Sequence, residues 1–271
     1  LSQVRFFIIG EDAAKAGLEP CLDFAIRKPE IKNDAEVLII TDKTANELIE
    51  SSKEEDTFLG ESLESVRSKE EKRVKGVIST LDTMQKHFSE KNKAFCAINL
   101  KSQETTYTDG YCVFTDGKLS EILDSDTSRG IDYVIVNIKS DEIYVENQFG
   151  AEITNIKIKR KADVQNNKVT FEIKTDFTTE VRQMQNLSLG KNTKAMAKMQ
   201  NEYIEMLMNK AISYVKNSGN DILEIESLLK AKKPKEWEEI KNSFDVKDVN
   251  FKFETKSEIS KTENLELTEE S

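Results

Sequence analysis

The stretch VRFFIIGEDAAKAGLEPCLDFAIRKPEIKNDAEVLIITDKTANEL, residues Val4–Leu48, decides the fold of the first part of the chain. Its two apolar runs, VRFFII and AEVLII, are rich in β-branched and aromatic residues and short enough to be buried strands. A helix is predicted between them, beginning at Glu19 and ending before Pro29, because the residue that precedes a proline avoids helical geometry. The order strand, helix, strand, followed by a short helix from Thr44, is typical of an α/β layer.

The middle of the chain is less regular. The charged zone SSKEEDTFLGESLESVRSKEEKRVKG, residues 51–76, predicts an exposed linker or a solvated, frayed helix. A helix is expected at Leu81–Phe88, where apolar side chains share one face. Strands are expected near residues 94–100 and 111–114, and Ile131–Ile138 is apolar enough to predict one more strand.

The last part of the chain has the clearest periodicity. Residues 168–181 alternate between apolar and polar side chains, as a strand with one dry and one wet face does. The same alternation returns at residues 249–259. Between them a long helix is predicted from Thr193 to Lys216, with one apolar stripe and with Gly219 as its left-handed cap.

These patterns predict an α+β, multi-domain fold, with a mixed α/β N-terminal part and a C-terminal antiparallel sheet packed against one long helix. Of the 271 residues, 37% are hydrophobic and 33% are charged, which favours several small cores over one thick core. We therefore expect an N-terminal α/β domain at 1–55, a middle domain with the charged linker at 56–142, and a C-terminal α+β domain at 143–271.

The net charge of −10 disfavours nucleic acid and anionic lipid as direct ligands, because both require basic surfaces. No apolar run approaches the ~18 residues that span a bilayer. We therefore expect any membrane attachment to come from a segment outside this sequence or from a partner protein.

The residues that catalysis and metal binding require are scarce. His87 is the only histidine, and its charged surroundings are typical of a solvated surface residue. Asp124 begins a segment that imitates a calcium loop, but Arg129 and Ile135 stand where that loop needs a glycine and a bidentate glutamate. A capped turn explains Asp124 better. We expect no catalytic residue, no cofactor and no metal.

The three cysteines are Cys21, Cys96 and Cys112, an odd number without CxxC spacing. Each lies in an apolar setting, where an unpaired cysteine behaves as a small hydrophobic residue. A disulfide between Cys96 and Cys112 is the alternative, since each is expected on a strand.

The opening stretch resembles the C-subunit lipoproteins of spore nutrient-germinant receptors, the GerAC-like or Ger(x)C family. The residues that carry the resemblance are Ile9-Gly10-Glu11, Leu22-Asp23-Phe24, Arg27, Pro29-Glu30-Ile31 and Lys43-Thr44-Ala45. Two later stretches are similar to the same family, GYCVFTDGKLSEILDSDTSRGIDYVIV (residues 110–136) and NDILEIESLLKAKKPKEWEEIKNSF (residues 220–244). The resemblance therefore extends over nearly the whole chain.

The resemblance implies a non-enzymatic subunit that acts in spore germination by assembling with A-type and B-type membrane subunits. It also implies a lipid-anchored protein at the outer face of the spore inner membrane, with the lipid on a cysteine that precedes Leu1, so that the sequence is expected to be a fragment. The alternative is an independent extracytoplasmic lipoprotein that binds a small solute. An enzyme of unfamiliar type is a third class.

The candidate interaction or family-motif positions are Asp23, Arg27, Pro29, Glu180, Asp221 and Trp237. Arg27 is expected to cap its helix, to pair with Asp23, or to contact a partner. Trp237 shares an apolar helix face with Ile240 and Phe244, which favours a structural anchor.

The methionines of the long helix allow two roles, because flexible thioethers fill core gaps and also suit adaptable binding surfaces. Met196 and Met199 are expected in the core. Met206 and Met208 lie off the main stripe, and the sequence leaves both roles open for them.

Overall fold

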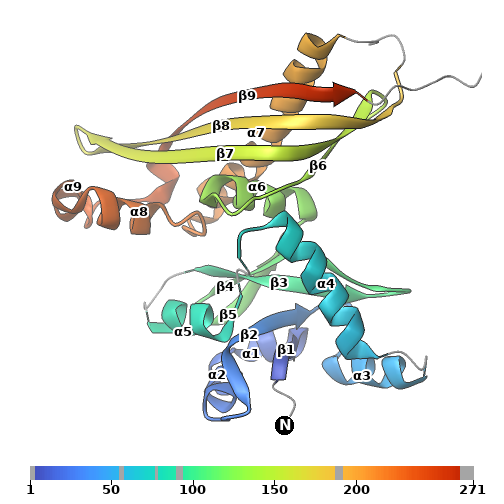
Figure 1. The fold of residues 1–271 in the computed structure, drawn as a ribbon. Helices are drawn as coiled ribbons and strands as arrows, with labels where there is room; N and C mark the ends of the chain where they lie inside the picture. Colours follow the sequence, from blue (N-terminus) through green and yellow to red (C-terminus); the bar gives the residue numbers. More distant parts are fainter. Residues whose placement is uncertain (1–3, 55–57, 77–78, 90–93, 187–191, 263–271) are drawn as a thin grey trace, which may run out of the picture.

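The computed structural model describes residues 4–54, 58–76, 79–89, 94–186 and 192–262. Two separate sheets lie one above the other, with the chain passing from the N-terminal sheet to the C-terminal sheet (Figure 1). The α+β class predicted from the sequence is confirmed. The three-domain division at residues 55 and 142 stays a prediction.

The N-terminal sheet has five strands in sequential order. They are β1 (Val4–Gly10), β2 (Ile31–Ile40), β3 (Phe95–Ser102), β4 (Thr106–Thr115) and β5 (Lys118–Ile122). The first three are parallel, and β3, β4 and β5 form antiparallel pairs. Asp116 and Gly117, with φ of 52° and 73°, make the tight turn between β4 and β5.

Helices cover both faces of this sheet. One face, whose core includes Leu22, Met84 and Phe114, packs against α1 (Glu11–Ala16), α2 (Glu19–Ile26) and α5 (Leu81–Ser89). The other face packs against α3 (Ala45–Glu54) and α4 (Leu59–Arg73). The predicted strands at the start of the chain, the helix between them and the helix at Leu81–Phe88 are therefore confirmed.

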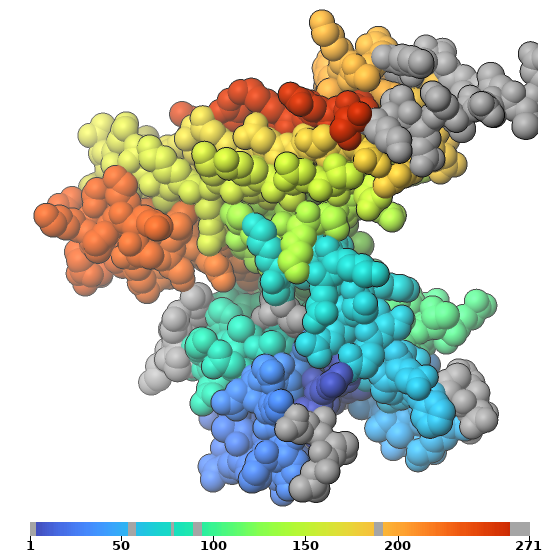
Figure 2. Space-filling model, viewed as in Figure 1, coloured from blue at the N-terminus to red at the C-terminus, as the bar shows by residue number. Residues whose placement is uncertain are grey.

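The charged zone at residues 51–76 is more structured than expected. Its residues 59–73 form α4, a helix that buries Leu63 and Val66 against the sheet. Two apolar side chains three positions apart on one helix face dock it, and exposed charged residues such as Glu61, Lys69 and Lys72 cover the outside. In Figure 2 this helix reaches from the N-terminal lobe to the C-terminal lobe.

The C-terminal sheet has four strands in sequential order. They are β6 (Glu142–Val145), β7 (Phe149–Gln165), β8 (Lys168–Met184) and β9 (Asn250–Thr262). β7 and β8 form a long hairpin, closed by Asn166 and Asn167 with φ of 50° and 60°. The prediction of a wholly antiparallel sheet is wrong for one pair, because β9 runs parallel to β8. The helices between the two strands return the chain to the end at which β8 begins.

That crossover is α7 (Thr193–Ser218), α8 (Ile225–Lys232), α9 (Pro234–Ile240) and the short η2 (Val246–Asp248). The predicted long helix is confirmed, and Gly219 ends it with a φ of 81°. Its buried face is rotated from the predicted stripe, and consists of Met196, Gln200, Ile204, Leu207, Met208, Ala211, Ile212 and Val215. Met199 is half-buried and Met206 is exposed.

The prediction of a strand at Ile131–Ile138 is wrong. These residues lie mostly in α6 (Ser125–Ile135), whose N-cap Asp124 accepts a hydrogen bond from the backbone of Thr127, as expected for a capped turn. The run IDYVIV is apolar because α6 is buried on both sides, and periodicity alone does not separate a short buried helix from a buried strand.

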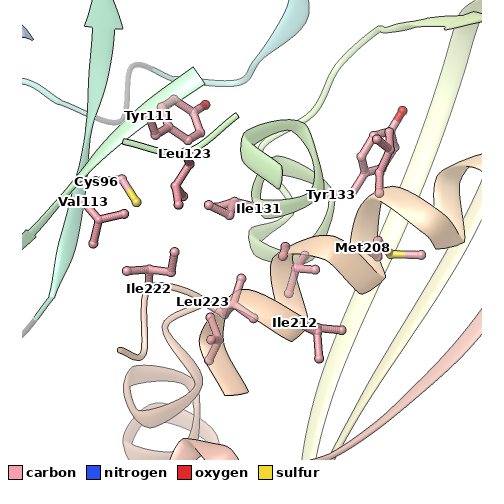
Figure 3. Close-up of a cluster of buried hydrophobic side chains, with 14 of the residues drawn as sticks. Cys96, Tyr111, Val113, Leu123, Ile131, Tyr133, Met208, Ile212, Ile222 and Leu223 are labelled. Atoms are coloured by element: carbon pink, nitrogen blue, oxygen red, sulfur yellow. The ribbon is translucent and has the colours of Figure 1, made fainter. Parts of the chain in front are cut away.

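Helix α6 joins the two sheets into one core (Figure 3). Ile131 points toward Cys96 and Val113 of the N-terminal sheet, and Tyr133 lies on the side of Met208 of α7. Gly130 permits this packing: a Cβ atom there would overlap the backbone oxygen of Leu207 and lie 3.1 Å from the Cβ of Ala211. Only glycine allows the backbones of α6 and α7 to approach so closely.

We expect Gly130→Ala to lower the free energy of unfolding by about 2–4 kcal/mol, because the added methyl must push α6 from α7 or distort both helices. Urea denaturation checks this. The matched control is Gly60→Ala in α4, where a Cβ meets nothing within 4 Å and the change is neutral or slightly stabilising. Equal effects of the two substitutions would contradict the close contact.

Candidate functional site

Charged side chains are buried where α4, α6 and β4 meet, between the two sheets. Asp132 of α6 is fully buried and accepts hydrogen bonds from Arg73 (2.7 Å), from the Tyr111 hydroxyl (2.9 Å) and from Asn137 (3.3 Å). Arg73 also donates to Glu70 at 2.9 Å. The Asp132 carboxylate thus has donors from α4, from β4 and from the loop that follows α6, which fixes α6 against the end of α4.

This arrangement holds Arg73 in its charged form. Burial alone would lower the pKa of Arg73, but the carboxylates of Asp132 and Glu70 raise it above its ordinary value. Burial raises the pKa of the Asp132 carboxyl, and the hydrogen bonds from Arg73 and Tyr111 oppose that effect. Burial also raises the pKa of Tyr111, so that its hydroxyl remains a donor to Asp132.

A second buried ion pair lies on the side of α6 that faces the C-terminal sheet. Arg129 donates two hydrogen bonds to one oxygen of Asp141 at 2.8 and 3.1 Å, and a third to the Tyr203 hydroxyl of α7 at 2.8 Å. Tyr133 donates to the same Asp141 oxygen at 3.1 Å. Burial would lower the pKa of Arg129, but Asp141 raises it above its ordinary value. The pair ties α6 and α7 to the start of β6.

Main-chain hydrogen bonds complete the connection. The carbonyl of Arg73, at the end of α4, accepts from the backbone nitrogens of Lys139 (2.7 Å) and Ser140 (3.2 Å). The backbone nitrogen of Lys75 donates to Asn137 at 2.6 Å. We call the residues that make these contacts between the sheets the polar junction: Glu70, Arg73, Tyr111, Arg129, Asp132, Tyr133, Asn137, Asp141 and Tyr203.

A cavity of about 300 Å³ lies beside the polar junction, between β3, α5, α6 and the loop after α7. Its polar lining comes from Thr83, His87, Asn137, Asp221 and Glu224, and apolar side chains complete the wall. Non-glycine residues with positive φ lie beside it, Val136 at 65° and Glu224 at 59°. A β-branched residue in this region is strained, and such strain concentrates at functional sites.

The structure places one predicted position, Asp221, at this cavity. Its carboxylate accepts hydrogen bonds from the backbone nitrogens of Ile225 (3.0 Å) and Glu226 (2.7 Å), so it caps the N-terminus of α8. His87 also lies here, half-buried and stacked on Phe95 with the ring planes 3° apart. The expectation of a solvated histidine is therefore wrong, because the α5 face that carries His87 packs on β3.

Asp23, Arg27 and Pro29 lie together at the exposed end of α2. Arg27 is the C-cap residue, and its Nε donates to both carboxylate oxygens of Asp23 at 2.8 and 2.9 Å. Both side chains are well exposed. Phe24 beside them is 54% exposed, and the Lys28 ammonium lies 5.3 Å from its ring centroid. The helix end thus combines the expected cap and ion pair with an exposed aromatic ring.

The two remaining candidates lie on the C-terminal sheet and its crossover. Glu180 of β8 contacts Arg182 at 3.1 Å on the wet face of the sheet. Trp237 of α9 is buried, with its ring edge-on to Phe244 at 5.3 Å. The six predicted positions therefore occupy four separate places, and no single site brings them together. These places are the cavity with Asp221, the end of α2 with Asp23, Arg27 and Pro29, the wet face with Glu180, and α9 with Trp237.

The cysteines are unpaired. Cys96 pairs in register with Val113, and Ala97 with Cys112. Since neighbouring residues of a strand point to opposite faces, the thiols of Cys96 and Cys112 lie on opposite sides of the sheet, in different cores. Their separation excludes the disulfide alternative.

Within the residues that the structure describes, no cluster of three or more histidine, cysteine or acidic side chains could hold a metal ion. None of the described helices is both long enough and apolar enough to cross a membrane.

Sequence reasoning missed the polar junction. One signal was available, because Asp132 interrupts the apolar run GIDYVIV and a charge inside such a run requires a buried partner. The partner Arg73 lies in the charged zone before Val74, where nothing distinguishes it from the neighbouring lysines. Local sequence therefore indicates the buried carboxylate but not the guanidinium that it contacts.

Comparison with known proteins defines the class of the fold. The structure resembles one solved chain, titled "Crystal Structure of the GerBC protein", with a TM-score of 0.74 over 95% of this chain and 79% of that chain, at 14% sequence identity. No curated protein sequence gives a significant match.

The family follows from sequence. Residues 109–263 match the family described as "Spore germination B3/ GerAC like, C-terminal", and residues 1–102 match the "Spore germination protein N-terminal domain". The chain belongs to the GerAC-like family of spore germination proteins. The resemblance found in the sequence is thereby confirmed.

Removal of the buried carboxylate tests the polar junction. We expect Asp132→Ala to lower the free energy of unfolding by about 3–5 kcal/mol, because it leaves the Arg73 charge buried without its main partner. The control is Glu226→Ala, which breaks an exposed pair with Lys230 on α8 and costs less than ~1 kcal/mol. A similar cost for both, measured by urea denaturation, would refute the structural role.

A further buried carboxyl, Glu36 of β2, lies 3.0 Å from Arg67 of α4. Burial raises the pKa of Glu36 from 4.5 to about 7; Arg67 lowers it, while Glu71, Glu64 and Glu70 raise it further. Between these two values the carboxyl is protonated in the folded protein and ionised in the unfolded chain. Its contribution to stability is therefore greatest at low pH and is lost as the pH rises to about 7.

We expect Glu36→Gln to remove this pH dependence. The free energy of unfolding of the wild type, relative to the variant, should fall by up to about 3 kcal/mol between acid and neutral pH. Urea denaturation of both proteins on the two sides of this range measures the difference. A wild-type-to-variant difference that is constant with pH would show that Glu36 keeps an ordinary pKa.

Proposed function

We propose that this protein is the C-subunit of a nutrient germinant receptor and acts by assembling with A-type and B-type membrane subunits. The observation that carries the proposal is the family match, which extends over both halves of the chain. In this proposal the subunit performs no chemistry. It contributes surfaces to the assembled receptor.

The protein is held, in this proposal, at the outer face of the spore inner membrane by a lipid on an N-terminal cysteine. One or two acyl chains supply membrane affinity that an acidic body with a net charge of −10 lacks. The family's lipoprotein character, as the sequence resemblance implies it, supports this location.

The polar junction favours a protein that holds its two sheets in a fixed relation. Hinged binding proteins have few contacts across their interface, whereas here buried ion pairs and one continuous apolar cluster connect the sheets. A subunit that must present several surfaces to partners at once benefits from such rigidity.

The end of α2 is our first candidate for a partner contact. Phe24 and Ile26 are 54% and 40% exposed, and Arg27 stands beside them. Exposed aromatic and arginine side chains are common at the centres of protein interfaces. An exposed ion pair such as Arg27–Asp23 contributes little to stability, so a substitution at Arg27 can test recognition without unfolding the protein.

A second function, an independent lipoprotein that binds a small solute, is favoured by one observation. The cavity beside the polar junction has a volume of about 300 Å³ and a mixed polar and apolar lining. Such a space is large enough for a small metabolite. The two sheets differ in the number and direction of their strands, however, whereas binding proteins of the hinged type use two similar lobes.

The test is charge reversal at the helix end in spores. We expect Arg27→Glu to leave the protein folded, since exposed substitutions change stability by less than ~1 kcal/mol, and to reduce nutrient-triggered germination together with co-purification of the membrane subunits. The matched control is Lys86→Glu, which breaks an exposed pair with Asp82 on α5. Normal germination in spores without the whole protein and its paralogues would reject the receptor role.

A further inference from the structure

Helix α7 exposes one apolar side chain on its outer face. Met206 is 37% exposed, although its neighbours Leu207 and Met208 are buried. The residues around it on the outer face, Glu202, Asn209, Lys210 and Ser213, are polar, so Met206 is an apolar spot among polar side chains. A methionine at such a position is typical of adaptable binding surfaces.

Met206 lies in a groove between α7 and the N-terminal turn of α6, two helices that run beside each other in Figure 3. The groove has a volume of about 680 Å³, and Asp124 and Thr127 form its α6 side. Asp124 is fixed there because its two carboxylate oxygens accept hydrogen bonds from Thr127, at 2.8 and 3.0 Å. The close packing of α6 on α7 at Gly130 holds the two walls together.

The groove is acidic. Its wall carries the carboxylates of Asp124, Glu202 and Glu205, and Lys210, which also lines the groove, is paired with Asp126 at 2.5 Å. Burial would raise the pKa of Asp124, but the hydrogen bonds from Thr127 lower it, so Asp124 remains a carboxylate at neutral pH. Glu202 lies 3.7 Å from Lys198 of the neighbouring turn, with both side chains largely exposed.

We propose that this groove binds a basic, amphipathic segment of a partner protein. An apolar side chain of the partner would cover Met206, and its lysine or arginine residues would face Asp124, Glu202 and Glu205, in the manner of a helix that binds in a groove. Charge decides against the other occupants: nucleic acid and anionic lipid are repelled, and a second copy of this chain has a net charge of −10. The inference does not depend on which partner carries the segment.

The probe is a designed amphipathic peptide of leucine and lysine, titrated into the full chain labelled at the methionine methyl groups. Six methionines give few signals, and Met206→Leu assigns the relevant one. We expect saturable binding that shifts the Met206 signal and weakens with salt. The reversal Glu202→Lys with Glu205→Lys should raise the Kd about tenfold or more at an unchanged melting temperature.

The matched control is Glu238→Lys with Glu239→Lys, the same change of charge on the exposed face of α9. The proposal is overturned if this control weakens binding as much, if a leucine–glutamate peptide binds equally well, or if the Met206 signal does not move. Sedimentation tests whether a second copy of this chain occupies the groove. A dimer that dissociates when Glu202 and Glu205 are reversed to lysine would assign the groove to that second copy and would contradict the proposal.

Discussion

The contact between the backbones of α6 and α7 at Gly130 is the constraint on which the rest of the structure depends. Helix α6 is short, and seven of its eleven residues are buried, so beyond its first turn it has little solvent-exposed surface. It can occupy this place only if one face reaches the N-terminal sheet while the other lies directly on α7. The absence of a side chain at Gly130 brings the two helices close enough for both conditions to hold.

Each polar side chain in the buried part of α6 requires a partner, and those partners decide how the sheets are joined. Asp132 takes its donors from the N-terminal half, whereas Arg129 contacts Asp141 and Tyr203 in the C-terminal half. The helix is thus fixed by ion pairs of opposite polarity on its two sides. Such pairs add little net stability compared with apolar packing, but they are costly to break singly, which favours one arrangement over its alternatives.

A feature of this structure can be predicted from the sequence when the residues that determine it lie close together along the chain. The β7–β8 hairpin can be predicted because its signals are local: the turn residues Asn166 and Asn167, and the alternation of apolar and polar residues beside them. The identity of α6 could not, because residues 131–136 form a short, mostly apolar run, and periodicity alone does not assign such a run to a helix or a strand. The parallel direction of β9 and the Arg73–Asp132 contact depend on chain segments far apart in sequence, so no local pattern encodes them.

The parallel addition of β9 also has a consequence for how the protein is made. Strand β8 gains a partner on this edge only when residues 250–262 arrive, after three helices have been synthesised. Until then the edge of β8, with the apolar residues Phe171, Ile173 and Phe177 beside it, stays open to pairing with other chains. Non-local pairing of this kind is slow. The nascent chain is therefore most prone to aggregation until β9 has been synthesised, and loss of β9 would make that state permanent.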